Sequence, residues 1–180
     1  LTFVLSGPNA YGQSALSLVF QDDFSDGSDR WETTDADSWT LTNEDGRPAW
    51  GINKRKSDYQ PKVRSPHNIA LVRDLNLTET IIEFDVKSTR DTGNHRDCCV
   101  FFQYQDPEHF YYVHLGAKPD PHSGQIMIVD GAPRRALTTN KKAVPWADQW
   151  HHPKLERSTT TGKIAVLLDD MKNPLMKVHA

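Results

Sequence analysis

The side chains best suited to chemistry lie in one stretch, residues 97–116, which reads DCCVFFQYQDPEHFYYVHLG. Residues 106–109 have the composition of a tight turn, so the stretch predicts a hairpin of two strands. One face of this hairpin would mix aromatic rings with amides and an imidazole, because strand side chains alternate faces. Rings stack on the CH faces of sugars, and amides bind hydroxyl groups. The residues predicted to bind such a ligand are Phe101, Gln103, Gln105, Phe110, Tyr112 and His114.

The opposite face of the same hairpin is apolar and is predicted to enter the core. Pairing across the turn places Gln105 opposite Phe110 and Tyr104 opposite Tyr111. The expected core residues of this face are Val100, Phe102, Tyr104, Tyr111, Val113 and Leu115.

A second candidate constellation is a pair of carboxylates on the predicted strand 80–88, TIIEFDVKS. Glu83 and Asp85 are two residues apart on one face, which puts them about 7 Å apart. Such a pair could act as general acid and base in glycosidic-bond hydrolysis, with His114 nearby. The alternative is an ordinary solvated strand face.

An acidic cluster near the start of the chain could supply oxygen ligands to a structural Ca²⁺. Its carboxylates are Asp22, Asp23 and Asp26, close to Ser25 and Gly27. The spacing is not that of an EF-hand, so the alternative is an acidic turn, and no cofactor is required by the sequence. The adjacent Cys98 and Cys99 would point to opposite faces of a strand, which predicts free thiols.

Charge and length exclude several classes of protein. The chain has 180 residues, with 21 basic and 24 acidic side chains and a net charge of −3, which does not favour nucleic acid as a partner. No run is long enough to insert in a membrane. Residues 1–15 resemble the end of a signal peptide, with a possible cleavage site near Ser14-Ala15; a tail or a first strand is the alternative. A signal peptide would imply a secreted or periplasmic protein.

The elements that must position these side chains are short strands separated by turn signals, with no amphipathic helix. The pattern predicts an all-β domain over residues 16–180, a two-sheet antiparallel β-sandwich. Asp45-Gly46 marks a hairpin turn. Pro153 inside a strand pattern predicts an edge position or a local break. Residues 54–64 are basic and aperiodic, which predicts a surface loop over the sheet, at the rim of a site.

The order of these motifs resembles a known superfamily. DDFS is followed by TIIEFDVK, FFQYQDPEHFYYVHLG, WHHPKLER and KIAVLLDD. This order is similar to that of the concanavalin A-like (laminin G-like) jelly-roll domains of secreted bacterial proteins, most of all the 3-keto-disaccharide hydrolase, or glycoside-hydrolase-like, domains. The resemblance implies a jelly-roll fold and an oligo- or polysaccharide on the concave sheet. Such domains continue with a Gly-rich turn and a last strand, so we expect a chain truncated at its C-terminus.

Two sister groups of this superfamily suggest different activities. Laminarinase-like hydrolases carry Glu-x-Asp-x-x-Glu, of which Glu83 and Asp85 match the first half while Ser88 stands at the third position. Alginate-lyase-like enzymes use Gln, His, Tyr and Arg. Gln103, Tyr112, His114 and Arg96 supply these residue types, with Tyr112 and His114 as the proton-transfer pair.

Three functions therefore remain open from the sequence. The first is a carbohydrate-active enzyme, either a glycoside hydrolase or a polysaccharide lyase. The second is a non-catalytic carbohydrate-binding or adhesion module of a larger extracellular protein, since fold does not decide function. The third is a structural domain whose aromatic face packs against another protein.

Overall fold

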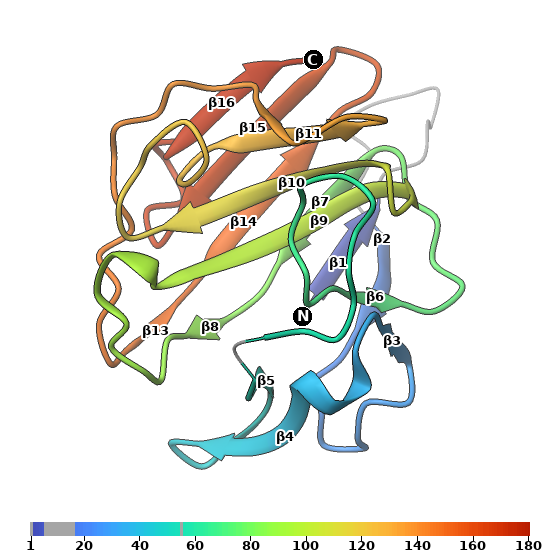
Figure 1. Cartoon of the computed structure of the whole chain (residues 1–180), viewed down its shortest axis with the longest axis vertical. Coiled ribbons are helices and arrows are strands. Elements are labelled where there is room, and N and C mark those ends of the chain that lie inside the picture. The colour runs from blue at the N-terminus through green and yellow to red at the C-terminus, as the bar shows by residue number, and fades with distance from the viewer. Residues whose placement is uncertain (1, 6–16, 55) are drawn as a thin grey trace.

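The computed structural model of the chain is all-β, as the sequence predicts (Figure 1). It describes residues 2–5, 17–54 and 56–180, and for 2–5 the backbone alone. Within these residues, the helical structure consists of two short 3-10 turns, Ala36–Ser38 and Gly93–His95. No helix in this described part has the length and apolar character needed to cross a membrane.

The larger sheet is antiparallel and has the strand order β16-β15-β14-β7-β1-β2. Its strands are β1 (Thr2–Leu5), β2 (Ser17–Gln21), β7 (Thr80–Glu83), β14 (Pro153–Arg157), β15 (Lys163–Leu168) and β16 (Met176–His179). Thr2–Leu5 thus forms a strand between β2 and β7, which matches the first-strand alternative for the start of the chain. The cleavage site expected near Ser14-Ala15 lies outside the described residues.

The smaller sheet has the order β12-β11-β10-β9. Its strands are β9 (Asp97–Asp106), β10 (His109–Gly116), β11 (Ile126–Asp130) and β12 (Arg135–Ala136). Three two-stranded sheets complete the described strands: β3 (Trp31–Thr33) with β6 (Ala70–Val72), β4 (Trp39–Glu44) with β5 (Arg47–Ile52), and β8 (Val86–Lys87) with β13 (Trp150–His151).

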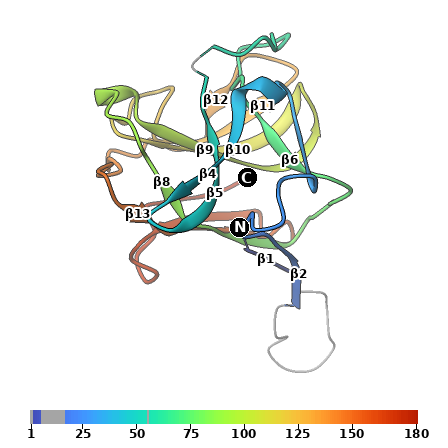
Figure 2. The same ribbon diagram turned by 90° about the horizontal axis from the view of Figure 1, so that it is seen from below.

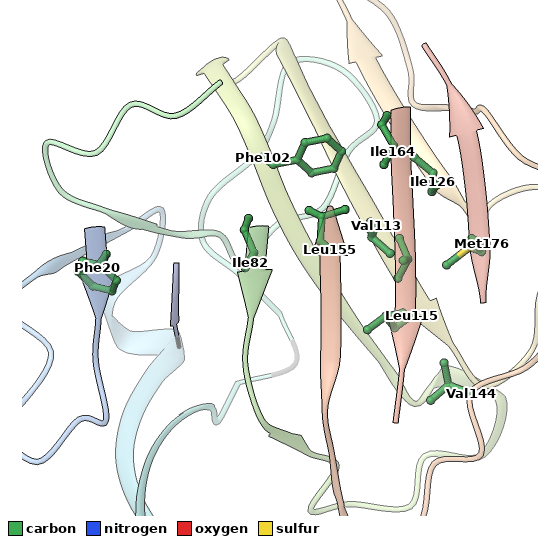
Figure 3. Packing of buried hydrophobic residues seen from close by; sticks show 11 residues of the cluster. Phe20, Ile82, Phe102, Val113, Leu115, Ile126, Val144, Leu155, Ile164 and Met176 are labelled. Atoms are coloured by element: carbon green, nitrogen blue, oxygen red, sulfur yellow. The ribbon is translucent and has the colours of Figure 1, made fainter. Parts of the chain in front are cut away.

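The main apolar core lies between the two larger sheets (Figure 3). Ile82 and Leu155, which pair across β7 and β14, contribute from one sheet. Val113 and Leu115 on β10 contribute from the other, and all four are at most 3% exposed. Burial of aliphatic side chains of this size stabilises the fold by about 1.5–3 kcal/mol each, so this layer fixes the relative position of the two sheets.

The β9–β10 hairpin forms about the predicted turn but with a different register. His109 pairs with Asp106 as expected, whereas Tyr111 pairs with Phe102 instead of Tyr104. The shift is a β-bulge at Gln103, whose φ of 48° lies in the left-handed region. Tyr104 therefore leaves the predicted core face and stacks on Phe110, with ring centroids 5.2 Å apart. The prediction for Tyr104 is wrong because alternation alone does not reveal a bulge.

The break predicted at Pro153 is also present. β13 ends at His151 and β14 begins at Pro153, whose carbonyl accepts a hydrogen bond from the Phe84 backbone N–H at 3.3 Å. β14 itself lies inside the larger sheet, between β7 and β15, and not at an edge.

Candidate functional site

The outer face of the smaller sheet, which points away from the main core, carries the aromatic residues expected to meet a ligand. Its register places Tyr112 in the centre, opposite Phe101 on β9 and opposite Met127 on β11. His114 lies one step along β10 on the same face, opposite Cys99. The rings of Tyr112 and Phe101 stack at 5.7 Å, and those of Tyr112 and His114 are 6.4 Å apart.

This outer face is covered, which corrects the expectation of an open binding surface. Phe110 is 2% exposed, Tyr112 0% and His114 8%. Together with Met127 and Val129, the two aromatic residues form a second apolar cluster. Hydrophobic patterning marks both faces of this hairpin as apolar but does not say which face a loop will cover.

The cover segment is the connection between β5 and β6, residues 53–54 and 56–69, which crosses the smaller sheet (Figures 1 and 2). Val63 is its one described side chain in the second apolar cluster. The segment also makes polar contacts with the turns of this sheet. The Arg64 carbonyl accepts a hydrogen bond from the Arg134 backbone N–H at 2.9 Å, and Lys62 pairs with Glu108 at 3.1 Å. The segment predicted as a loop over the sheet therefore covers the site instead of forming its rim.

Buried polar atoms without hydrogen-bond partners gather beneath and beside this cover. Among the described residues ten buried side-chain nitrogen or oxygen atoms lack a partner. One is Asn68 Oδ1 at the end of the cover segment, and four more belong to this region. They are Ser65 Oγ, Tyr112 Oη, His114 Nε2 and Arg134 Nε. An unsatisfied buried polar atom costs about 1–3 kcal/mol, so these atoms call for an ordered water or a polar ligand as their partner.

His114 has one ring nitrogen fixed and the other available. Its Nδ1 lies 3.0 Å from the His122 carbonyl oxygen, which only accepts, so Nδ1 donates. In the neutral imidazole Nε2 then carries the lone pair and can act as a base. Nε2 is 3.1 Å from Asp97 Oδ2 without the geometry of a hydrogen bond, so a carboxylate lies beside this nitrogen.

Two arginines that the sequence reasoning missed shape the electrostatics around Tyr112. Burial raises the pKa of the Tyr112 hydroxyl well above its ordinary value of 10.0, and the nearby Cys99 acts in the same direction. The positive charges of Arg134 and Arg64 oppose this rise in pKa. The aperiodic basic segment was the available signal for Arg64; nothing in the sequence placed Arg134 on this face.

The predicted hydrolase residues are not brought together. Ile82 points into the main core, so its neighbour Glu83 faces outward from the larger sheet, where it pairs with Lys154 at 3.3 Å. His114 faces outward from the other sheet, because Val113 and Leu115 on either side of it are core residues. The main core thus separates Glu83 from His114. The expected group of Glu83, Asp85 and His114 is wrong for this structure, since one strand pattern does not tell which sheet lies opposite.

Asp85 is instead the centre of a network of ion pairs. Its Oδ1 is 2.8 Å from His152 Nδ1, and its other oxygen pairs with Arg47 on β5. Burial acts to raise the pKa of Asp85, but the hydrogen bond from His152 and the Arg47 charge outweigh it and lower that pKa. Arg47 also lies over the Trp150 ring, 4.4 Å from its centroid. The network attaches the β4–β5 hairpin to the segment after β7.

The remaining predicted binding residues have structural partners or lie apart. The guanidinium of Arg96 donates to Ser88 Oγ at 2.9 Å and to the Ser88 carbonyl at 3.0 Å. Gln103 accepts a hydrogen bond from Arg157 Nε at 2.8 Å, on the core side of the bulge. Gln105 is exposed near the turn. None of the three joins Tyr112 and His114.

The acidic cluster near the start of the chain forms turns. Asp22 accepts from the Phe24 backbone N–H and from Trp31 Nε1, both at 2.9 Å. Asp23 accepts from the Ser25 backbone N–H at 3.0 Å and from its hydroxyl at 2.7 Å. No group of three or more His, Cys, Asp or Glu side chains in the described part of the chain is arranged to hold a metal ion. The carboxylates of Asp22 and Asp23 thus serve as hydrogen-bond acceptors in turns, and a Ca²⁺ ion at Asp22, Asp23 and Asp26 stays a prediction.

No protein-family profile, curated protein or solved structure matches this chain in comparisons with known proteins. The chemistry of the candidate site must therefore be argued from its own residues.

Proposed function

We propose that this protein is a secreted, concanavalin A-like carbohydrate-binding domain whose ligand lies against Tyr112 and His114. The unpartnered buried polar atoms on the outer face of the smaller sheet are the observation that carries the proposal. Glycan hydroxyls both donate and accept hydrogen bonds, so they suit Tyr112 Oη, which can do either, and His114 Nε2, which accepts when neutral. The stacked rings of Phe101 and Tyr112 supply apolar surface for the CH faces of a sugar.

Binding requires the cover segment to move away from Tyr112, because that side chain is fully buried. This movement exposes Val63 together with the apolar side chains beneath it, Phe110, Met127 and Val129, so the bound glycan must cover this surface again. The polar contacts that the cover segment gives up can be replaced by water or by the glycan. A glycan would then occupy the space between the sheet and the displaced segment.

The test is a screen of the full chain against an array of neutral and acidic oligosaccharides, followed by titration calorimetry on each glycan that binds. Tyr112→Phe removes only the hydroxyl and should weaken binding about three- to ten-fold, the worth of one neutral hydrogen bond. Tyr111→Phe is the matched control. Tyr111 is the preceding residue, stacks on Phe102 on the core side, and should bind like the wild type.

Hydrogen exchange supplies the second measurement. Glycan binding should change exchange at the amides of residues 56–69 and leave the amides of β14 and β15 as they were. A folded wild-type chain that binds no glycan overturns the proposal. So does a glycan that Tyr112→Phe and Tyr111→Phe bind equally well. Product analysis on each bound glycan then separates an enzyme, in which His114 would act as a base, from a binding module.

A further inference from the structure

Two guanidinium groups at the edge of this site have no ionic partner. Neither Arg64 nor Arg134 forms an ion pair with any described residue. The undescribed residues, 1, 6–16 and 55, contain no Asp or Glu. By contrast, Lys62 in the same cover segment is paired with Glu108 at 3.1 Å. The positive charges of the two arginines are therefore not compensated by an ion-pair partner.

The fold brings these two arginines to the same place. The Arg134 backbone N–H donates to the Arg64 carbonyl at 2.9 Å, so the cover segment and the β11–β12 turn meet there. Ala136 pairs with Met127, an outer-face residue beside Tyr112, and Arg135 pairs with Ile128 on the core side. By alternation Arg134 belongs to the outer face. Its Nε is buried and has no acceptor.

We propose that Arg64 and Arg134 form an anion subsite and that the glycan bound against Tyr112 carries a carboxylate or sulfate group. The inference rests on the proposed glycan-binding function. A planar guanidinium binds a carboxylate or sulfate through paired N–H donors. A neutral sugar at the same position would offer only uncharged acceptors to the buried Nε of Arg134. Asp97 lies beside His114, so the site has an acidic part and a basic part, which would orient an acidic glycan along the sheet.

The experiment compares ligands that differ only in charge. Titration calorimetry is run with an oligogalacturonate and with its methyl ester, which keeps the sugar and removes the carboxylate charge. A sulfated galactan oligosaccharide and its desulfated form make the second pair. We expect the charged member of at least one pair to bind roughly ten- to hundred-fold more tightly, the worth of a charge-assisted hydrogen bond. The pair in which the charged ligand binds more tightly shows whether the anionic group is a carboxylate or a sulfate.

Variants locate the subsite. Arg134→Gln should reduce the affinity for the charged ligand to about that of its neutral form, and Arg64→Gln should act in the same direction. Arg135→Gln is the matched control, because Arg135 is adjacent in sequence but faces the other side of the sheet. Thermal unfolding confirms that each variant is folded.

The outcomes separate the subsite from the function. If neutral and charged ligands bind equally well and Tyr112→Phe weakens the binding of both, the anion subsite is overturned. The proposed glycan binding then remains. The anion subsite is also overturned if Arg134→Gln and Arg135→Gln reduce the affinity for the charged ligand equally. A folded protein that binds none of the ligands, nor any on the array, overturns the proposed function itself.

Discussion

At the residue scale, Asp35 holds the cover segment in place. Its carboxylate accepts a hydrogen bond from the Asp58 backbone N–H at 2.7 Å and lies 3.4 Å from Lys54 Nζ. Its side chain is 5% exposed. The hydrogen bond from Asp58, helped by Ser38 and Lys54, outweighs the effect of burial and lowers the pKa of Asp35 to about 2. A side chain outside the cover thus helps to keep Tyr112 inaccessible.

This lowered pKa predicts a pH-dependent stability. A carboxyl whose pKa is about 2 when folded, against about 3.9 when unfolded, stabilises the fold above the unfolded value. That contribution is lost as the pH falls through the folded value. Asp35→Asn should therefore lower the urea midpoint at about pH 7 more than at about pH 3. Exposed Asp37 provides the control, Asp37→Asn, and an equal loss at both pH values for Asp35→Asn would contradict the assignment.

At the element scale, charged and polar groups attach the β4–β5 hairpin to the segment after β7 and to the β8–β13 strand pair. Besides the Arg47–Asp85 pair, Lys87 pairs with Asp45 at 2.9 Å, and Trp150 Nε1 donates to Asp45 at 3.0 Å. Side chains in the Arg47–Asp85 pair are 51% and 37% exposed. Pairs this exposed are screened by water and salt, so each stabilises little.

The substitution Asp85→Asn should consequently have only a small effect on the stability of the fold. We expect it to lower the free energy of unfolding by less than about 1 kcal/mol, with a smaller effect in high salt. Glycan affinity should not change, because Asp85 follows β7 in the larger sheet and lies away from Tyr112. Urea denaturation and calorimetry check the two statements. Loss of glycan turnover without loss of binding would instead restore a catalytic role for Asp85.

The strands and turns also show which features of the fold can be predicted from local sequence patterns. The Asp45-Gly46 turn, the strand at residues 163–168 and the break at Pro153 follow from local chemistry, and the structure contains all three. The bulge at Gln103 has no local signal, since glutamine rarely adopts φ above zero. Its stabilising contact is the distant Arg157, 54 residues further along the chain. Register beyond the bulge could therefore not be predicted.

At the scale of the whole molecule, two apolar layers are stacked: the core between the sheets, and the second cluster under the cover segment. The all-β class follows from short strands and many turns. The second layer could not be predicted from the sequence, because the residue pattern of an apolar outer face is the same whether a ligand, a partner or a loop covers it. Tyr112 and His114 were predicted as neighbours and are neighbours. Glu83 and Asp85 were grouped with His114, but Glu83 lies in the other sheet and Asp85 follows it in the chain.

The reactivity of the two adjacent cysteines can report whether each of these two apolar layers is open or closed. Cys98 packs in the core between the sheets, and Cys99 packs under the cover segment. Burial raises the pKa of the Cys98 thiol to about 12 and that of Cys99 well above its usual value, so both react slowly while the layers are closed. Alkylation followed by mass spectrometry should modify Cys99 first as the cover lifts, and Cys98 only on global unfolding. Simultaneous modification would show that the two layers open as one.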